Sequence, residues 1–152
     1  MKPFIHAKSS VKKWGGKPDD YMPIHNLMDS SKGTIADSRH RCLTHNTWFI
    51  GPDGPLERIF GYTLINSDGR EISIRDIGEQ HILEDFGGQF IPSAQDYLQE
   101  IEMKDWMVSG KGTPPSFAKV VDGMKANRPE VKTLADIVNR PPVTDTKTYI
   151  ID

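Results

Sequence analysis

Residues 62–88 read YTLINSDGREISIRDIGEQHILEDFGG, and this stretch carries the clearest structural signals in the chain. Two short β-prone runs, Tyr62–Ile65 and Glu71–Ile74, flank a Ser-Asp-Gly turn, which is the pattern of a β-hairpin. Residues 76–86 favour a helix, and Gly87-Gly88 supplies the left-handed conformation that ends one. The stretch therefore predicts a hairpin that leads into a helix.

Further helices are predicted on both sides of this stretch. Pro23 fits the first position of a helix that runs to Ser30. Residues 34–50 have apolar side chains at helical spacing and predict one longer helix. Ser93 is placed to cap a helix after residue 92, whereas the lysine-rich residues 8–17 are expected to form a solvated arm. The predicted fold class is α+β and helix-rich, with about four helices, one small β-hairpin and an extended C-terminal extension.

The chain is expected to divide into a compact domain, residues 1–107, and a linker with a C-terminal extension, residues 108–152. Glycine and proline concentrate in residues 109–115, as is typical of a linker. Short helices are expected near residues 116–125 and 133–138. Because the extension has too little apolar surface to fold alone, it packs on the main domain, wraps a partner such as a second copy of the chain, or stays mobile.

The composition indicates a folded globular protein of 152 residues, with 36% hydrophobic and 26% charged residues. Cys42 is the only cysteine, which excludes an internal disulfide and indicates a reducing compartment. We find neither a signal peptide nor a membrane-spanning segment, and we expect a cytoplasmic protein. The net charge of −2 gives no reason to expect a nucleic-acid partner.

The residues with chemical potential are histidines that have carboxylates at helical spacing. His25 and Asp29 are four residues apart, Asp37 and His40 are three apart, and His81 precedes a Glu-Asp pair by three and four residues. Side chains at these spacings leave the same face of a helix. Imidazole and carboxylate together are ligands for zinc, iron, manganese or nickel, so we expect a divalent metal site.

The candidate metal ligands are His25, Asp29, Asp37, His40, His81, Glu84 and Asp85. The candidate outer ligands or acid–base groups are His6, His45 and Glu79. The spacing also limits the hypothesis, because His40 and His45 would lie about 140° apart on one helix and would be poor joint ligands. The competing interpretation is that these are ordinary hydrogen-bonded pairs, each contributing a few tenths of a kcal/mol.

Arg39 and Arg41 flank His40 and have two interpretations of equal weight. Their planar donor groups are suited to grip a phosphate or a carboxylate. Alternatively, they pair with nearby carboxylates and join helices together.

A resemblance extends over residues 1–107. The ordered set that carries it is Ile5-His-Ala-Lys-Ser-Ser10, Tyr21 to His25, Asp37-Ser-Arg-His-Arg41, Leu43-Thr-His45, Phe60-Gly61, Asn66-Ser-Asp-Gly-Arg70, Arg75-Asp-Ile-Gly-Glu-Gln-His81 and Glu84-Asp-Phe-Gly87. The set resembles an uncharacterised domain family of bacteria and their phages. The resemblance implies a bacterial or phage source and a bacterial cytoplasm, and it implies no settled activity.

Our leading functional expectation is a metal-binding domain, with a metal-dependent hydrolase of unknown substrate as its finer form. A bound divalent ion would lower the pKa of its water and provide a nucleophile at neutral pH. The alternative is a non-catalytic phage or bacterial interaction or assembly protein, whose polar residues form a structural network and whose extension binds a host factor or a second copy. A nucleotide or nucleic acid held by Arg39, Arg41 and Lys12-Lys13 has the least support.

Overall fold

The computed structural model describes residues 1–115, and their contacts form two compact units. One contains residues 1–98, and the other begins at Gln99 and includes the short helix α8 (Asp105–Ser109). The helices expected near residues 116–125 and 133–138 lie outside the described residues. Among residues 1–115 no helix is long and apolar enough to cross a membrane.

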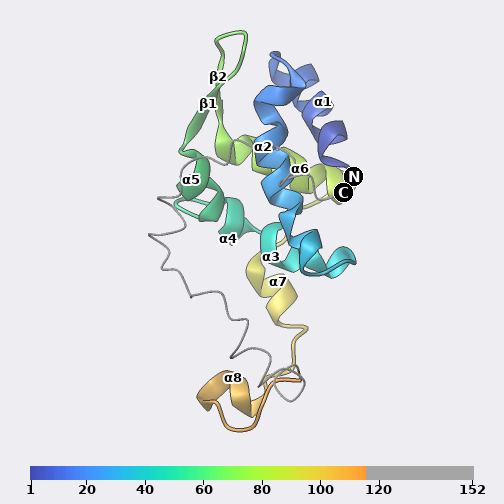
Figure 1. Cartoon of the computed structure of the whole chain (residues 1–152), viewed down its shortest axis with the longest axis vertical. Helices are drawn as coiled ribbons and strands as arrows, with labels where there is room; N and C mark the ends of the chain where they lie inside the picture. Colours follow the sequence, from blue (N-terminus) through green and yellow to red (C-terminus); the bar gives the residue numbers. More distant parts are fainter. Residues whose placement is uncertain (116–152) are drawn as a thin grey trace, which may run out of the picture. The chain divides into compact units, whose positions relative to one another are not determined.

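The first unit begins with two helices that lie side by side, α1 (Pro3–Trp14) and α2 (Pro18–Asp29) (Figure 1). The expectation of a solvated arm over residues 8–17 is therefore wrong. α1 presents a buried face of His6, Ala7, Ser10 and Trp14, and its two polar members mask the hydrophobic periodicity. α2 starts at Pro18, five residues before the expected start, with two aspartates in its first turn.

The single helix expected over residues 34–50 is also wrong. A 3₁₀ turn, η1 (Ser30–Gly33), precedes this range, and within it the chain forms a second 3₁₀ turn, η2 (Ser38–His40), and two one-turn helices, α3 (Arg41–Thr44) and α4 (Thr47–Ile50). Capping residues cause the breaks. The Asp37 side chain accepts a hydrogen bond from the Arg39 backbone at 2.9 Å, and Asn46 accepts one from Phe49 N–H at 2.9 Å.

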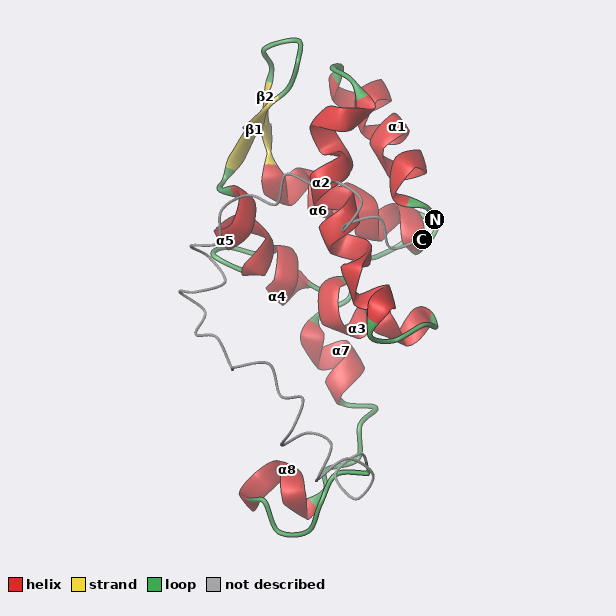
Figure 2. Ribbon diagram, in the orientation of Figure 1, coloured by secondary structure: helices red, strands yellow, loops and turns green. Residues whose placement is uncertain are grey.

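The predicted hairpin and the helix after it are confirmed, as is the helix-rich α+β class. A short helix, α5 (Pro55–Phe60), leads into the antiparallel strands β1 (Thr63–Ile65) and β2 (Glu71–Ser73), in which Leu64 pairs with Ile72. The hairpin projects from the helices, and α6 (Ile74–Asp85) follows it directly (Figure 2). The last helix of the unit is α7 (Ala94–Leu98).

α6 is the central element, since it packs against α1, α2, α4 and α5. Its apolar side chains Ile77 and Ile82 are fully buried, together with Leu56 of α5 and Met28 of α2. Gly78 allows the closest approach, because a Cβ there would lie 2.7 Å from Leu56 Cδ2 and 2.9 Å from Ile50 Cγ2. The missing side chain at position 78 thus brings α4 and α5 against α6.

Gly78→Ala tests this packing. Alanine in a helix interior is favoured over glycine by about 1 kcal/mol. Overpacking a core costs about 1–3 kcal/mol, so we expect a net loss of roughly 1 kcal/mol in the free energy of unfolding. Urea denaturation measures it. The loss should shrink in a Leu56→Ala background, because the nearest atom in the way is gone. An equal loss in both backgrounds would contradict the explanation.

Candidate metal centre

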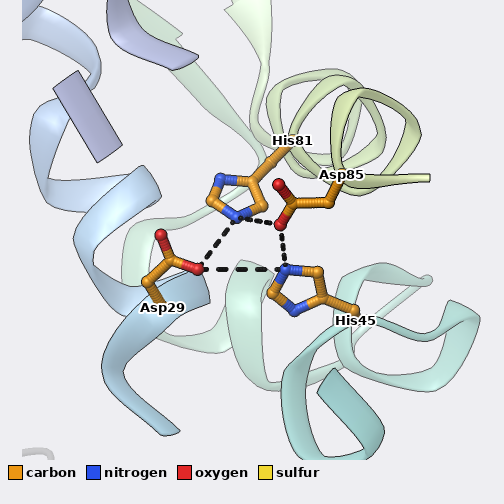
Figure 3. Close-up of side chains that lie close together, drawn as sticks. All are labelled: Asp29, His45, His81 and Asp85. Atoms are coloured by element: carbon orange, nitrogen blue, oxygen red, sulfur yellow. Dashed lines mark hydrogen bonds and ion pairs between the residues drawn. The ribbon is translucent and has the colours of Figure 1, made fainter. Parts of the chain in front are cut away.

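Four buried polar side chains converge between three segments of the first unit (Figure 3). Asp29 ends α2, His45 follows α3, and His81 and Asp85 lie one turn apart on α6. Each offers one nitrogen or oxygen atom, and these four atoms lie within 4.8 Å of one another. We call these four residues the centre.

The donor atoms of the centre form a ring of alternating nitrogen and oxygen. His81 Nε2 lies 3.3 Å from Asp29 Oδ1 and 3.5 Å from Asp85 Oδ2. His45 Nε2 lies 2.9 Å from Asp85 Oδ2 and 3.9 Å from Asp29 Oδ1. The exposed fractions of the four side chains are 0% for both histidines and 1–2% for the aspartates, so bulk water does not solvate the centre.

Local backbone structure explains why each donor side chain points into the centre. His81 and Asp85 are four residues apart on α6, which places both side chains on the face toward α2. His45 has a non-helical backbone, with φ −99° and ψ 62°, between α3 and the Asn46 cap of α4. The break in the expected long helix therefore turns His45 inward.

Each histidine of the centre is held by a hydrogen bond at its other ring nitrogen. His45 Nδ1 lies 2.8 Å from Thr44 Oγ1, which itself donates to the Met28 carbonyl oxygen at 2.6 Å. His81 Nδ1 lies 2.9 Å from His25 Nδ1, and His25 Nε2 lies 2.9 Å from Ser10 Oγ. Such outer hydrogen bonds orient metal-binding histidines in proteins.

Positive charges contact the outer sides of the two carboxylates. Lys32 Nζ lies 3.3 Å from Asp29 Oδ2, and the amino group of Met1 lies 3.0 Å from Asp85 Oδ1. The other oxygen of each carboxylate faces the histidine nitrogens. Both Asp29 oxygens and His81 Nε2 are buried without a hydrogen-bond partner among the described residues.

The environment shifts the pKa values of the centre in both directions. Burial raises the pKa of Asp29 and of Asp85, but the neighbouring histidines, together with Lys32 beside Asp29, outweigh it and leave both pKa values below the ordinary value. Burial lowers the pKa of His45 to about 4, although Asp85 opposes the shift. For His81 burial also lowers the pKa, but both aspartates outweigh it and the pKa is raised.

Three other predicted residues lie next to the centre without being part of it, namely His25, His6 and Glu84. His25 is the hydrogen-bond partner of His81. His6 stacks on His81 with ring centroids 3.8 Å apart, its Nε2 lies 3.3 Å from Asp85 Oδ1, and its Nδ1 lies 3.5 Å from Glu84 Oε1. Burial lowers the pKa of His25, and the neighbouring His81 and His6 lower it further.

The remaining predicted residues contribute no donor to the centre. His40 is buried, with Nδ1 2.8 Å from Ser31 Oγ, and its ring packs edge-on to His45. Asp37 and Arg39 pair with each other in an exposed position, Arg39 Nη2 lying 2.7 Å from Asp37 Oδ2. Glu79 pairs with Arg75, and Arg41 lies over the Phe86 ring.

Several residues that support the centre escaped the sequence analysis. They are Ser10, Ser31, Lys32, Thr44 and Gln80. Each is an ordinary polar residue whose partner is distant in sequence or in the irregular segment after α2. A Ser or Gln on the buried face of a helix was the one available signal: for Ser10 it required recognition of α1 as a helix, whereas Gln80 lies on the helix predicted over residues 76–86.

The fold and the centre define a helix-rich α+β domain with a buried histidine–carboxylate cluster that can hold a metal. The family model of a domain of unknown function, DUF6915, matches residues 1–107, and the chain belongs to this family. Its description names no activity. The expected membership in an uncharacterised domain family is confirmed. No curated protein and no solved structure matches the chain.

The buried histidines make the stability of the metal-free protein depend on pH. His25, His40 and His45 have pKa values below the usual 6.5, so the unfolded chain binds more protons at pH 5 to 6.5. Their contribution is therefore lost as the pH falls. His81, with its raised pKa, acts in the opposite direction and loses its contribution as the pH rises.

With three histidines against one, we expect the free energy of unfolding to decrease on acidification from pH 8 to pH 5. Urea denaturation in the presence of a chelator measures it at each pH. A stability that increases toward pH 5 would contradict the assignment of His25, His40 and His45 as neutral in the fold.

Proposed function

We propose that this domain binds one divalent transition-metal ion, with zinc the most suitable, through Asp29 Oδ1, His45 Nε2, His81 Nε2 and Asp85 Oδ2. Zinc takes nitrogen and oxygen ligands in tetrahedral geometry. The donor set of two imidazoles and two carboxylates meets that requirement from four positions of one domain.

The observation that carries the proposal is the spacing of the donors. Two ligands that bind a tetrahedral zinc ion at about 2.0–2.1 Å lie about 3.3–3.4 Å from each other. The four nitrogen–oxygen separations in the centre range from 2.9 to 3.9 Å and bracket that value. These four separations are thus close to those that a tetrahedral ion would impose, and all four donor atoms lie within 4.8 Å of one another.

The electrostatics support the same conclusion. Burying a carboxylate costs several kcal/mol unless it is paired and hydrogen-bonded. Asp29 has two buried oxygens with no hydrogen-bond donor among the described residues, and its nearest ammonium group is 3.3 Å away. A divalent ion between the two aspartates would neutralise both and would accept the lone pairs of both histidines.

The burial of all four donors favours a closed centre that joins α2, the segment after α3 and α6. A catalytic zinc site keeps a coordination position open to water or substrate, whereas a structural site uses protein ligands for all four. The hydrolase therefore stays a prediction with less support than metal binding. The alternative interaction or assembly role for the extension also stays a prediction.

Metal content tests the proposal directly. Protein purified without chelator, or incubated with zinc, should contain about one ion per chain. Asp29→Asn and His81→Gln should lose it, because each removes one donor of the centre. Asp37→Asn is the control, since Asp37 has the same histidine–carboxylate spacing but pairs with Arg39 in an exposed position, and it should keep the ion.

The readout is elemental analysis together with competition against a chromophoric chelator, and circular dichroism verifies the fold of each variant. The proposal fails if the parent protein binds none of zinc, iron, manganese or nickel. It also fails if Asp37→Asn reduces the affinity as much as His81→Gln does.

Cobalt substitution separates a closed centre from a catalytic one. Tetrahedral cobalt(II) has intense visible bands that respond to any change of ligand. We expect these bands in the loaded protein and no change on addition of azide, because the four protein donors leave no open position. A spectral shift with azide would favour the hydrolase and would justify a substrate screen.

A further inference from the structure

A continuous line of buried hydrogen bonds extends away from the centre behind His81. His81 Nδ1 contacts His25 Nδ1 at 2.9 Å, and His25 Nε2 contacts Ser10 Oγ at 2.9 Å. Ser10 Oγ in turn lies 2.5 Å from Gln80 Oε1 and 3.1 Å from the carbonyl oxygen of His6. The three side chains of this relay, Ser10, His25 and Gln80, are 0–6% exposed.

The donor and acceptor of each hydrogen bond in the relay can be assigned by starting at Gln80. Its amide nitrogen donates to the His6 carbonyl oxygen at 3.0 Å and to the Glu84 carboxylate, and both partners only accept. The amide oxygen of Gln80 is therefore turned toward Ser10. The Ser10 hydroxyl then faces two acceptors, so its single proton is donated to one of them.

The other bonds follow from that assignment. Because the Ser10 proton is already donated, Ser10 Oγ accepts from His25, and His25 carries its proton on Nε2. A neutral His25 with a proton on Nε2 has a bare Nδ1, which accepts from His81 Nδ1–H. His81 Nε2, whose proton a metal ion can replace, then points between Asp29 and Asp85.

We propose that Ser10, His25 and Gln80 are positioning residues that keep the proton of His81 on Nδ1 and so present its Nε2 to a divalent metal ion. The inference rests on the proposed function and assigns a role to α1, which contributes no donor to the centre. Thr44 is placed to do the same for His45 once a metal replaces the His45 Nε2–Asp85 Oδ2 hydrogen bond, since its hydroxyl proton is donated to the Met28 carbonyl and its oxygen can accept from His45 Nδ1. The two histidines of the centre are therefore oriented by different residues, His81 by His25 and His45 by Thr44.

The first test is the protonation of His25, read by ¹⁵N nuclear magnetic resonance of protein labelled at histidine. We expect His25 to be neutral with its proton on Nε2, both without metal and with zinc. In the zinc-loaded protein we expect His81 to carry a proton on Nδ1 and to coordinate through Nε2. A proton on His25 Nδ1 in the loaded protein would overturn the relay.

The second test compares substitutions at His25 by zinc affinity, measured by chelator competition. His25→Leu leaves His81 Nδ1 without an acceptor, and removal of such outer partners lowers metal affinity by about 10–100-fold. His25→Asn can place its amide oxygen where Nδ1 stood, so it should restore most of the affinity. Rescue by asparagine separates hydrogen-bond acceptance from simple filling of the space.

Ile24→Ala is the matched control, because Ile24 is a buried neighbour on α2 that contacts neither the relay nor the centre through hydrogen bonds. It should destabilise the fold and leave zinc affinity unchanged. Equal affinity of His25→Leu and the parent, or an equal loss in Ile24→Ala, overturns the relay while metal binding stands. Failure of the parent protein to bind zinc overturns the proposed function and the relay with it.

Discussion

The structure of this domain depends on one constraint: its buried ionisable side chains must find partners without water. Two aspartates and three histidines are packed where α2, the segment after α3 and α6 meet, and all five side chains are at most 2% exposed. Burying such groups destabilises the fold unless each lone pair faces a hydrogen-bond donor or a cation. The surrounding polar residues hold the histidine rings in place, whereas both Asp29 oxygens and His81 Nε2 make no hydrogen bond within the described residues.

The apolar packing places these groups with little freedom. Gly78 brings α4 and α5 close to α6, and the same helix carries His81 about one turn and Asp85 about two turns further on. Asn46 ends the turn that holds His45, so the cap of a one-turn helix has a direct effect on the centre. A well-packed core does not deform continuously, which keeps the donors near fixed separations.

Local signals account for what was predicted from the sequence. The hairpin and α6 were found because turn chemistry and helix-ending glycines act over a few residues, and the pairing of His81 with Asp85 followed from their spacing. α1 was missed because its buried face contains His6 and Ser10, so a method that follows apolar periodicity sees a polar arm. The position of His45 was misjudged because Asp37 and Asn46 interrupt the helix on which the 140° argument depended.

Spacing along the sequence could not predict which of these residues come together in the tertiary structure. Asp29 and Asp85 are 56 residues apart, and only the packing of α2 against α6 brings them together. Asp37 and Glu79 have the same local patterns as the residues of the centre but face solvent in pairs with arginines. A histidine–carboxylate pair at helical spacing therefore describes a helix face, and the tertiary fold decides whether that face is interior.

The order of the segments has a consequence for synthesis on the ribosome. α1 and α2 emerge first and carry a face that includes His6, Ser10, His25 and Asp29, whose partners on α6 are made some fifty residues later. Until α6 has left the exit tunnel, α1 and α2 can pack on each other, but this polar face lacks its partners on α6. The nascent chain is thus committed to fold late, after residue 85, and its early segments stay accessible to chaperones and to cellular metal during that interval.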